Sequence, residues 1–267
     1  MAKSGVCKFC NEEGTLIEAH VLPKRMDLLN SLPKKLFTLD KTSPPKRSPR
    51  GSYDKDLLCH TCEHRYFEPL DTYAFDVLFN RRLEATAEFG FGEWLLRFRG
   101  ADGNRLKLFV LSVIWRASAS SRPDFEGCDL GGDQDLLREM VAHSKPGAPS
   151  YMPTIVGFEA DQGLLGTTIV PGFGRHESLQ TNVSSFWLGG YRFQSMIGQV
   201  DSDVFGPAKS ILLGGESDVL AFRTSAVSGK AGASFKRAFD ETDKKYGFDL
   251  GHRIPRVARA TKASRLE

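Results

Sequence analysis

Residues 57–64, LLCHTCEH, contain the second of two C-x-x-C pairs, and together with CKFC at 7–10 they decide the fold of this chain. In a reducing compartment, cysteine pairs at this spacing bind a metal ion more often than they form a disulfide. Both thiolates of a pair can reach one ion at about 2.3 Å, and two pairs complete a tetrahedral site. The sequence therefore predicts one structural Zn²⁺, held by Cys7, Cys10, Cys59 and Cys62. The alternative, a redox-active pair, requires a βαβ context that the surrounding sequence lacks.

A zinc ion bound by four cysteines has no open coordination position, so any chemistry must come from other side chains. The fifth cysteine, Cys128, lies outside this pattern, and we expect a buried, inert thiol.

Composition and hydropathy are those of a globular protein. Of the 267 residues, 40% are hydrophobic and 26% are charged. The longest apolar run, LKLFVLSVIW at 106–115, is shorter than the roughly 18 residues of a membrane helix and predicts a buried helix over 105–119. The N-terminal MAKSGVCKFC lacks the apolar stretch of a signal peptide, so we expect a cytoplasmic protein with no membrane partner.

Positive charge gathers toward both ends of the chain, although the net charge is only +3. Residues 24–55 hold nine Lys and Arg against three acidic residues, and residues 252–266 hold five against none. Such a distribution predicts a polyanionic partner. We expect the basic loop at 24–55 and the basic tail at 252–266 to bind DNA. Ordinary solvated surface charge is the alternative. The sequence leaves open whether the chain forms a homo-oligomer or has a regulatory partner.

The pattern of elements predicts an α+β fold in three segments. Residues 1–85 form a zinc-stapled ββα core, 86–148 a helical region packed on it, and 149–267 a β-rich domain with a terminal helix and a basic tail. Short β-like runs separated by Gly and Pro fill residues 153–225, and SILLG at 210–214 is one of them.

Within the first segment, the alternating stretch TLIEAHVLP at 15–23 predicts a strand that stops at Pro23. A helix is expected from Glu63, because apolar residues recur at helical spacing from Phe67 to Leu78. Pro69 either kinks this helix or marks its first turn.

A resemblance rests on the C-x-x-C pair, the His-x-x-Pro of His20 and Pro23, and LLC-x-x-C followed by Glu63 and a helix. This constellation resembles the zinc-knuckle type of the HNH endonuclease family, which has a ββα-metal core. The resemblance covers residues 5–80. It implies hydrolysis of phosphodiester bonds with one catalytic Mg²⁺ or Mn²⁺, and bacterial proteins of this shape often act in defence against phage or mobile DNA.

The resemblance assigns roles to individual residues. His20 matches the general base, and its ordinary pKa of about 6.5 suits proton uptake at neutral pH. Glu63 lies where the family commonly has an Asn or His that touches the metal, and a carboxylate there suits a hard cation. His64 is a further candidate for the catalytic site. Glu18, Asp56 and Glu68 are weaker candidates for binding the cation or supporting its ligands.

The sequence also departs from the family pattern, because Ala19 occupies the position where an Asp often precedes the histidine. If the strand runs through both residues, Glu18 shares a face with His20 and can approach the same metal. Each candidate also has a structural interpretation: His20 packs beside the zinc, and Glu63 interacts favourably with a helix dipole.

Two functions of different class follow. The first is a metal-dependent DNA endonuclease. The second is a catalytically inactive, zinc-stapled module that binds nucleic acid or another partner.

Overall fold

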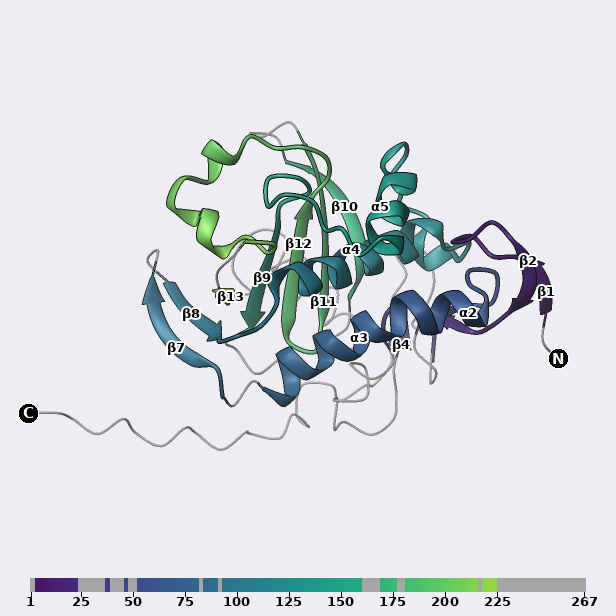
Figure 1. Ribbon diagram of the computed structural model, residues 1–267, viewed down its shortest axis with the longest axis horizontal. Coiled ribbons are helices and arrows are strands. Elements are labelled where there is room, and N and C mark those ends of the chain that lie inside the picture. The colour runs from purple at the N-terminus through teal and green to yellow at the C-terminus, as the bar shows by residue number, and fades with distance from the viewer. Residues whose placement is uncertain are drawn as a thin grey trace, which may run out of the picture.

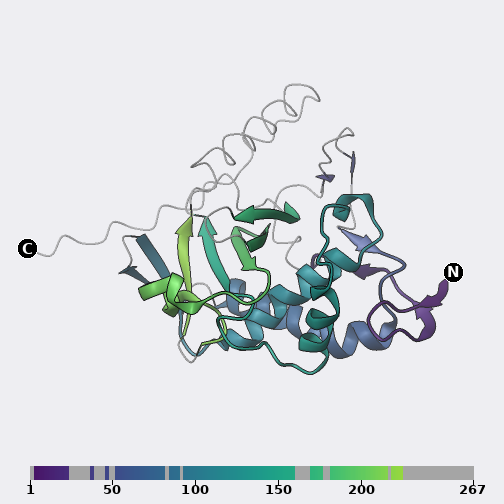
Figure 2. The same cartoon turned by 90° about the horizontal axis from the view of Figure 1, so that it is seen from above.

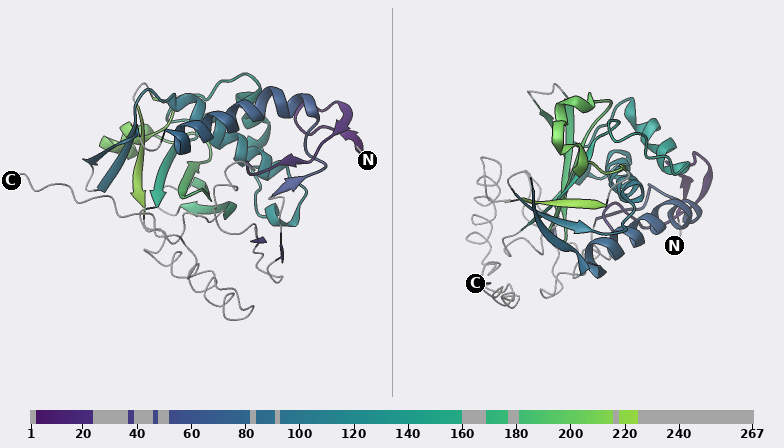
Figure 3. Two further views of the ribbon diagram at one scale, coloured as in Figure 1. Left: turned by 90° about the horizontal axis from the view of Figure 1, so that it is seen from below. Right: turned by 60° about the vertical axis from the view of Figure 1, so that its left-hand side comes forward.

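The computed structural model describes residues 3–23, 37–38, 46–47, 52–81, 84–90, 93–159, 169–176, 181–215 and 218–224. It is an α+β structure in which helices lie against one face of a large sheet, as Figures 2 and 3 show. The strands β1 (Lys3–Val6) and β2 (Glu13–Leu16) lie at one end, and β7 (Thr86–Gly90) and β8 (Glu93–Phe98) lie at the other (Figure 1). The expected mixed fold with a large C-terminal sheet is confirmed.

Three small two-stranded sheets come from the N-terminal part of the chain. Their pairs are β1 (Lys3–Val6) with β2 (Glu13–Leu16), β3 (Ala19–His20) with β6 (Tyr53–Asp54), and β4 (Phe37–Thr38) with β5 (Lys46–Arg47). The strand expected over 15–23 is therefore split between β2 and β3. This matters because Glu18 lies in the connection, so the argument that placed it on the face of His20 does not apply.

One long helical stretch covers residues 60–80 and passes through Pro69. Its segments are α2 (His60–Cys62), the π-helical turn η1 (Glu63–Phe67), α3 (Glu68–Phe75) and the π-helical turn η2 (Asp76–Asn80). A proline has no N–H to donate and its ring clashes with the carbonyl four residues earlier in an α-helix. The wider turn of η1, in which the Glu68 N–H donates to the Glu63 carbonyl, comes directly before Pro69 and accommodates it.

The second long helix, α4 (Gly103–Ala119), is buried on nearly every side, as predicted for residues 105–119. Asp102 caps its N-terminus by accepting hydrogen bonds from the N–H groups of Asn104 and Arg105. The turn η4 (Pro123–Phe125) and the helix α5 (Asp133–Ala142) follow.

The large sheet has seven strands in the order β10-β11-β12-β9-β13-β8-β7. Every neighbouring pair is antiparallel except β13 and β9. The strands are β7 (Thr86–Gly90), β8 (Glu93–Phe98), β9 (Thr154–Glu159), β10 (Ile169–His176), β11 (Thr181–Leu188), β12 (Tyr191–Met196) and β13 (Val219–Thr224).

Two expectations about secondary structure were wrong. Residues 86–98, expected in a helical region, form β7 and β8, because β8 finds its partner in β13 with Phe98 opposite Val219. The run at 210–214, expected as a strand, instead ends the 3-10 helix η6 (Ser202–Ile211) and continues into a turn. The sheet thus takes strands from both sides of residue 149, where a domain boundary was expected.

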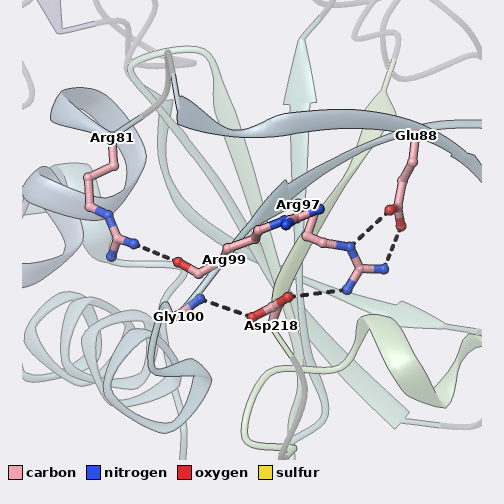
Figure 4. A network of polar contacts seen from close by, with 6 residues as sticks. All are labelled: Arg81, Glu88, Arg97, Arg99, Gly100 and Asp218. Carbon is pink, nitrogen blue, oxygen red and sulfur yellow. Dashed lines mark hydrogen bonds and ion pairs between the residues drawn. The ribbon is translucent and has the colours of Figure 1, made fainter.

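Polar contacts tie the end of the long helical stretch to the edge of the sheet (Figure 4). Arg81 donates to the carbonyl oxygen of Arg99 at 2.6 Å, just after β8. Arg97 of β8 donates to both carboxylate oxygens of Glu88 on β7, at 2.8 and 2.9 Å, and to Asp218 before β13 at 3.4 Å. Helix and sheet are therefore held in a fixed relation at this end.

A single hydrophobic core joins these layers. On the sheet side, Phe186 and Phe193 stack at 4.8 Å, and the Tyr191 hydroxyl donates to the Leu78 carbonyl at 2.7 Å. Within the described ranges, no helix is both long enough and apolar enough to cross a membrane.

Candidate metal centre and adjoining polar site

The four cysteines predicted to bind zinc come together, and this is confirmed by geometry. Their sulfur atoms all lie within 4.8 Å of one another. Cys7 follows β1, Cys10 lies in the turn before β2, Cys59 forms an isolated bridge with Leu16, and Cys62 ends α2. A tetrahedral zinc with bonds of about 2.3 Å needs sulfurs roughly 3.8 Å apart, so small side-chain adjustments suffice.

Backbone hydrogen bonds bring the two cysteine pairs to each other. The N–H of Lys8 donates to Leu57 and that of Ile17 to Leu58, both at 3.0 Å. The N–H of Cys59 donates to the sulfur of Cys7 at 3.3 Å. These hydrogen bonds join the segments around the two cysteine pairs, although 48 residues separate the pairs in the sequence.

The pKa values of Cys7 and Cys62 shift in opposite directions, because burial, backbone N–H groups and the neighbouring thiols act on them unequally. Burial opposes ionisation of Cys7, but surrounding backbone N–H groups outweigh it and lower its pKa. Burial and the neighbouring thiols, first that of Cys59, raise the pKa of Cys62. Four thiolates this close need a cation to neutralise them, and a set of four soft sulfur ligands suits Zn²⁺.

His20 lies on β3, half-buried, directly after the fully buried Ala19. Its strand pairs with β6, where Tyr53 is its partner and the two rings lie 6.4 Å apart. The His20 carbonyl accepts a hydrogen bond of 2.9 Å from Arg116. The candidate base is therefore fixed by a strand on one side and by α4 on the other.

Asp71 and Arg116 form a pair that the sequence analysis missed. Two guanidinium nitrogens of Arg116 donate to the two carboxylate oxygens of Asp71, at 2.7 and 2.9 Å. Burial raises the pKa of Asp71, whereas Arg116 and, less strongly, the protonated form of His20 act in the opposite direction. Asp71 therefore lies within electrostatic reach of His20.

Glu63 lies in the first π-helical turn, half-buried, and also faces this pair. Burial raises its pKa, Arg116 lowers it, and Asp71 and Glu68 raise it further. Among the described residues, its buried Oε2 atom has no hydrogen-bond partner. A partly desolvated carboxylate with an unsatisfied oxygen is a suitable ligand for a hard cation.

His64 and Glu68 lie on the exposed side of the same stretch. The Nδ1 atom of His64 is hydrogen-bonded to a carboxylate oxygen of Glu68, one turn further along. The rings of His60 and His64 are 4.1 Å apart. His64 and Glu68 come together because the helical stretch begins before Pro69.

Glu18 lies in the connection between β2 and β3, and Asp56 lies just after β6. Glu18 is exposed and forms an ion pair of 3.3 Å with Lys55. The N–H of Asp56 donates to Asp54 at 2.8 Å, so the turn after β6 is capped by the side chain of Asp54.

The structure thus brings His20 and Glu63 to the same Asp71–Arg116 pair and puts His64 and Glu68 beside them. In the ranges that the structure describes, no set of three such ligands outside the cysteine cluster lies as close together as those sulfurs. Mg²⁺ commonly binds through one or two carboxylates, with water and phosphate oxygens as its other ligands.

The basic regions predicted to contact DNA fall largely outside the described residues, as does the helix expected near 233–246. The chain matches no family model, no curated protein and no solved structure with which it was compared.

Proposed function

We propose that this chain is a metal-dependent endonuclease of the HNH type that hydrolyses DNA phosphodiester bonds. The observation that carries the proposal is the position of His20. Arg116 joins the strand of His20 to the helical stretch that contains Cys62, because it donates both to the His20 carbonyl and to the carboxylate of Asp71. A paired strand with a histidine, followed by a helix with an acidic residue, is the order that a ββα-metal core requires.

In this proposal His20 takes the proton from an attacking water molecule. A half-buried imidazole is a suitable general base at neutral pH, because unperturbed histidine side chains titrate near that pH. Its backbone is held between β6 and Arg116, which reduces the motion of the ring relative to a bound phosphate.

Glu63 is the residue proposed to hold the catalytic Mg²⁺ or Mn²⁺, through the carboxylate oxygen that has no other partner among the described residues. When bound, this cation supplies positive charge that offsets the charge developing on the phosphate. His64 and Glu68 are exposed beside Glu63, where they can contact the phosphate or the water around the cation.

The zinc has a structural role in this proposal, since four sulfurs leave no position for substrate. It fixes the start of the helical stretch, and with it Glu63, next to the β1–β2 hairpin. The basic residues of 24–55 and 252–266 are proposed to contact DNA phosphates, which makes binding sensitive to salt. Residues 149–267 are proposed to recognise the target, and defence against phage or mobile DNA is the biological role that fits.

Plasmid nicking tests the proposal. Supercoiled DNA is incubated with the zinc-loaded protein in Mg²⁺ and in Mn²⁺, beside His20→Ala and the control His143→Ala, which changes an exposed histidine after α5. We expect nicking by the wild type and the control, and a loss of about 100-fold or more in His20→Ala, the usual size of a general-base effect. Equal nicking by His20→Ala would contradict the assignment.

A second function is favoured by the residues before His20. Ala19 is fully buried and has no ligand atom, and Glu18 is engaged with Lys55. The carboxylate that often precedes the histidine in the family is therefore missing. A zinc-stapled module that binds nucleic acid or another partner without cutting is the alternative. DNA binding with no nicking in any divalent cation would favour this module.

A further inference from the structure

Arg116 occupies an unusual position for a charged side chain, in the last turn of the buried helix α4 with no exposed surface. Its guanidinium group is fully engaged. It donates to both oxygens of Asp71, to the carbonyl of His20 and, at 3.3 and 3.4 Å, to the carbonyl and hydroxyl of Ser112. The guanidinium also lies 5.3 Å from the ring centre of Phe67.

Burying a charge costs several kcal/mol unless it is paired and hydrogen-bonded. An apolar side chain of similar volume would fill the same space in α4 at a lower cost in desolvation free energy. Packing alone therefore explains the arginine poorly. The planar guanidinium group, with its several N–H donors, can contact the Asp71 carboxylate on the helical stretch and the His20 carbonyl on β3 at the same time.

We propose that Arg116 is the positioning residue of this site: it fixes His20 against the helical stretch and neutralises Asp71, so that His20 stays available as a base. The inference rests on the proposed nuclease function, and it adds a residue that touches neither DNA nor cation.

The effect of losing Arg116 on the pKa of His20 depends on the charged and titratable groups around the imidazole. Within the described residues, the contacts given for His20 come from Tyr53 on β6, Asp71 on α3 and Arg116 on α4. With Arg116 present, the charge of Asp71 is compensated within hydrogen-bond distance. Without it, the buried Asp71 carboxylate stays charged by pairing with a protonated His20, and a protonated ring cannot accept a proton from water.

The test is the pKa of His20, measured by NMR on full-length, zinc-loaded protein labelled with ¹⁵N in its histidines, with His20→Ala to assign the signal. We expect Arg116→Met to raise this pKa by about 0.5 to 1 unit, because an opposite charge nearby favours the charged form. Asp71→Asn should lower it, because the positive charge of Arg116 is then uncompensated. The double variant should return it toward the wild-type value, a reversal that loss of packing alone does not produce.

An unchanged His20 pKa in folded Arg116→Met would overturn the proposal, as would a rise that Asp71→Asn fails to reverse. If Arg116→Met loses its zinc or unfolds, Asp71→Asn alone decides: a lowered pKa supports the proposal and an unchanged one overturns it. The measurement needs no activity. Nicking that is absent in the wild type, beside the expected pKa pattern, would therefore reject the nuclease function and leave the role of Arg116 toward His20 intact.

Discussion

The carboxylate of Asp54 accepts a hydrogen bond of 2.7 Å from the hydroxyl of Ser120, across 66 positions of sequence. The same carboxylate accepts from the N–H and hydroxyl of Ser121 and from the N–H of Asp56. Asp54 is thereby the residue that fastens β6, the partner strand of His20, to the C-terminal end of α4. Arg116, in the last turn of the same helix, donates to the His20 carbonyl on β3, so two separate polar contacts fix this small sheet.

Asp54→Asn should destabilise the protein in a pH-dependent way. Burial opposes ionisation of Asp54, but the hydrogen bonds that it accepts outweigh burial and lower its pKa. A lowered pKa in the folded state gives stability that is complete above the unfolded value of about 3.9 and is lost as the pH falls through the folded value. We expect a loss of about 1–3 kcal/mol at pH 7, measured by urea unfolding.

The difference between wild type and Asp54→Asn should shrink below about pH 4. Asp129→Asn is the matched control, since that exposed aspartate accepts only the N–H of Gly131 among the contacts described. A constant difference from pH 3 to pH 7 would contradict the assignment.

Phe9, between the first two cysteines, should be a main contact between the metal site and the core. Its ring lies 4.8 to 5.1 Å from the rings of Tyr66, Phe67 and Trp115, and it is buried. Phe9→Ala should lower the free energy of unfolding by about 3–5 kcal/mol, as for other large-to-small core changes. Phe89→Ala, at a ring that is 67% exposed, should change it by less than about 0.5 kcal/mol. Similar losses in the two variants would show that the ring of Phe9 does not carry this contact.

Lys107 should give the protein a stability that rises with pH in the alkaline range. Its amine is buried in α4, donates to the carbonyls of Ala148 and Tyr151 at 2.8 and 2.7 Å, and burial lowers its pKa to about 8. Between this value and the unfolded pKa of about 10.4, the unfolded chain binds more protons, so raising the pH favours the folded state. The free energy of unfolding should rise from pH 8 to 10 relative to that of Lys107→Met. A flat or falling difference would show that the folded amine keeps its ordinary pKa.

Elemental analysis should find about one zinc per chain, because one tetrahedral set of four sulfurs is present in the described residues. Cys62→Ser should lose this ion or bind it far more weakly and unfold more readily, since structural zinc contributes folding energy. Cys128→Ser should keep the full zinc content, because Cys128 is buried elsewhere. Equal zinc content in both variants would exclude the cluster as the binding site.

The local features of this chain were predictable because they depend on spacing alone. Two C-x-x-C pairs predict a four-sulfur cluster whatever the structure of the residues between them. The apolar run of α4 predicts a buried helix. His64 and Glu68 are four positions apart, so helical geometry alone brings them together.

The features that sequence failed to predict depend on contacts between distant segments. Arg116 is a single charge in an apolar helix, and its importance appears only when Asp71, 45 positions earlier, lies opposite. The strand β8 is defined by its pairing with β13, more than 120 positions later, which local periodicity does not encode. The importance of Asp54 appears only in the folded structure, because its partners Ser120 and Ser121 lie at the end of α4.

The central claim is that Glu63 holds a divalent cation beside His20 for phosphodiester hydrolysis. The most direct test measures the rate of plasmid nicking against Mg²⁺ concentration for the wild type, Glu63→Gln and the control Glu126→Gln at an exposed position. We expect a rate that saturates with Mg²⁺ in the wild type and the control, and at least about tenfold more Mg²⁺ for half of the maximal rate in Glu63→Gln. No Mg²⁺-dependent nicking by the wild type, or an unchanged Mg²⁺ requirement in Glu63→Gln, would contradict it.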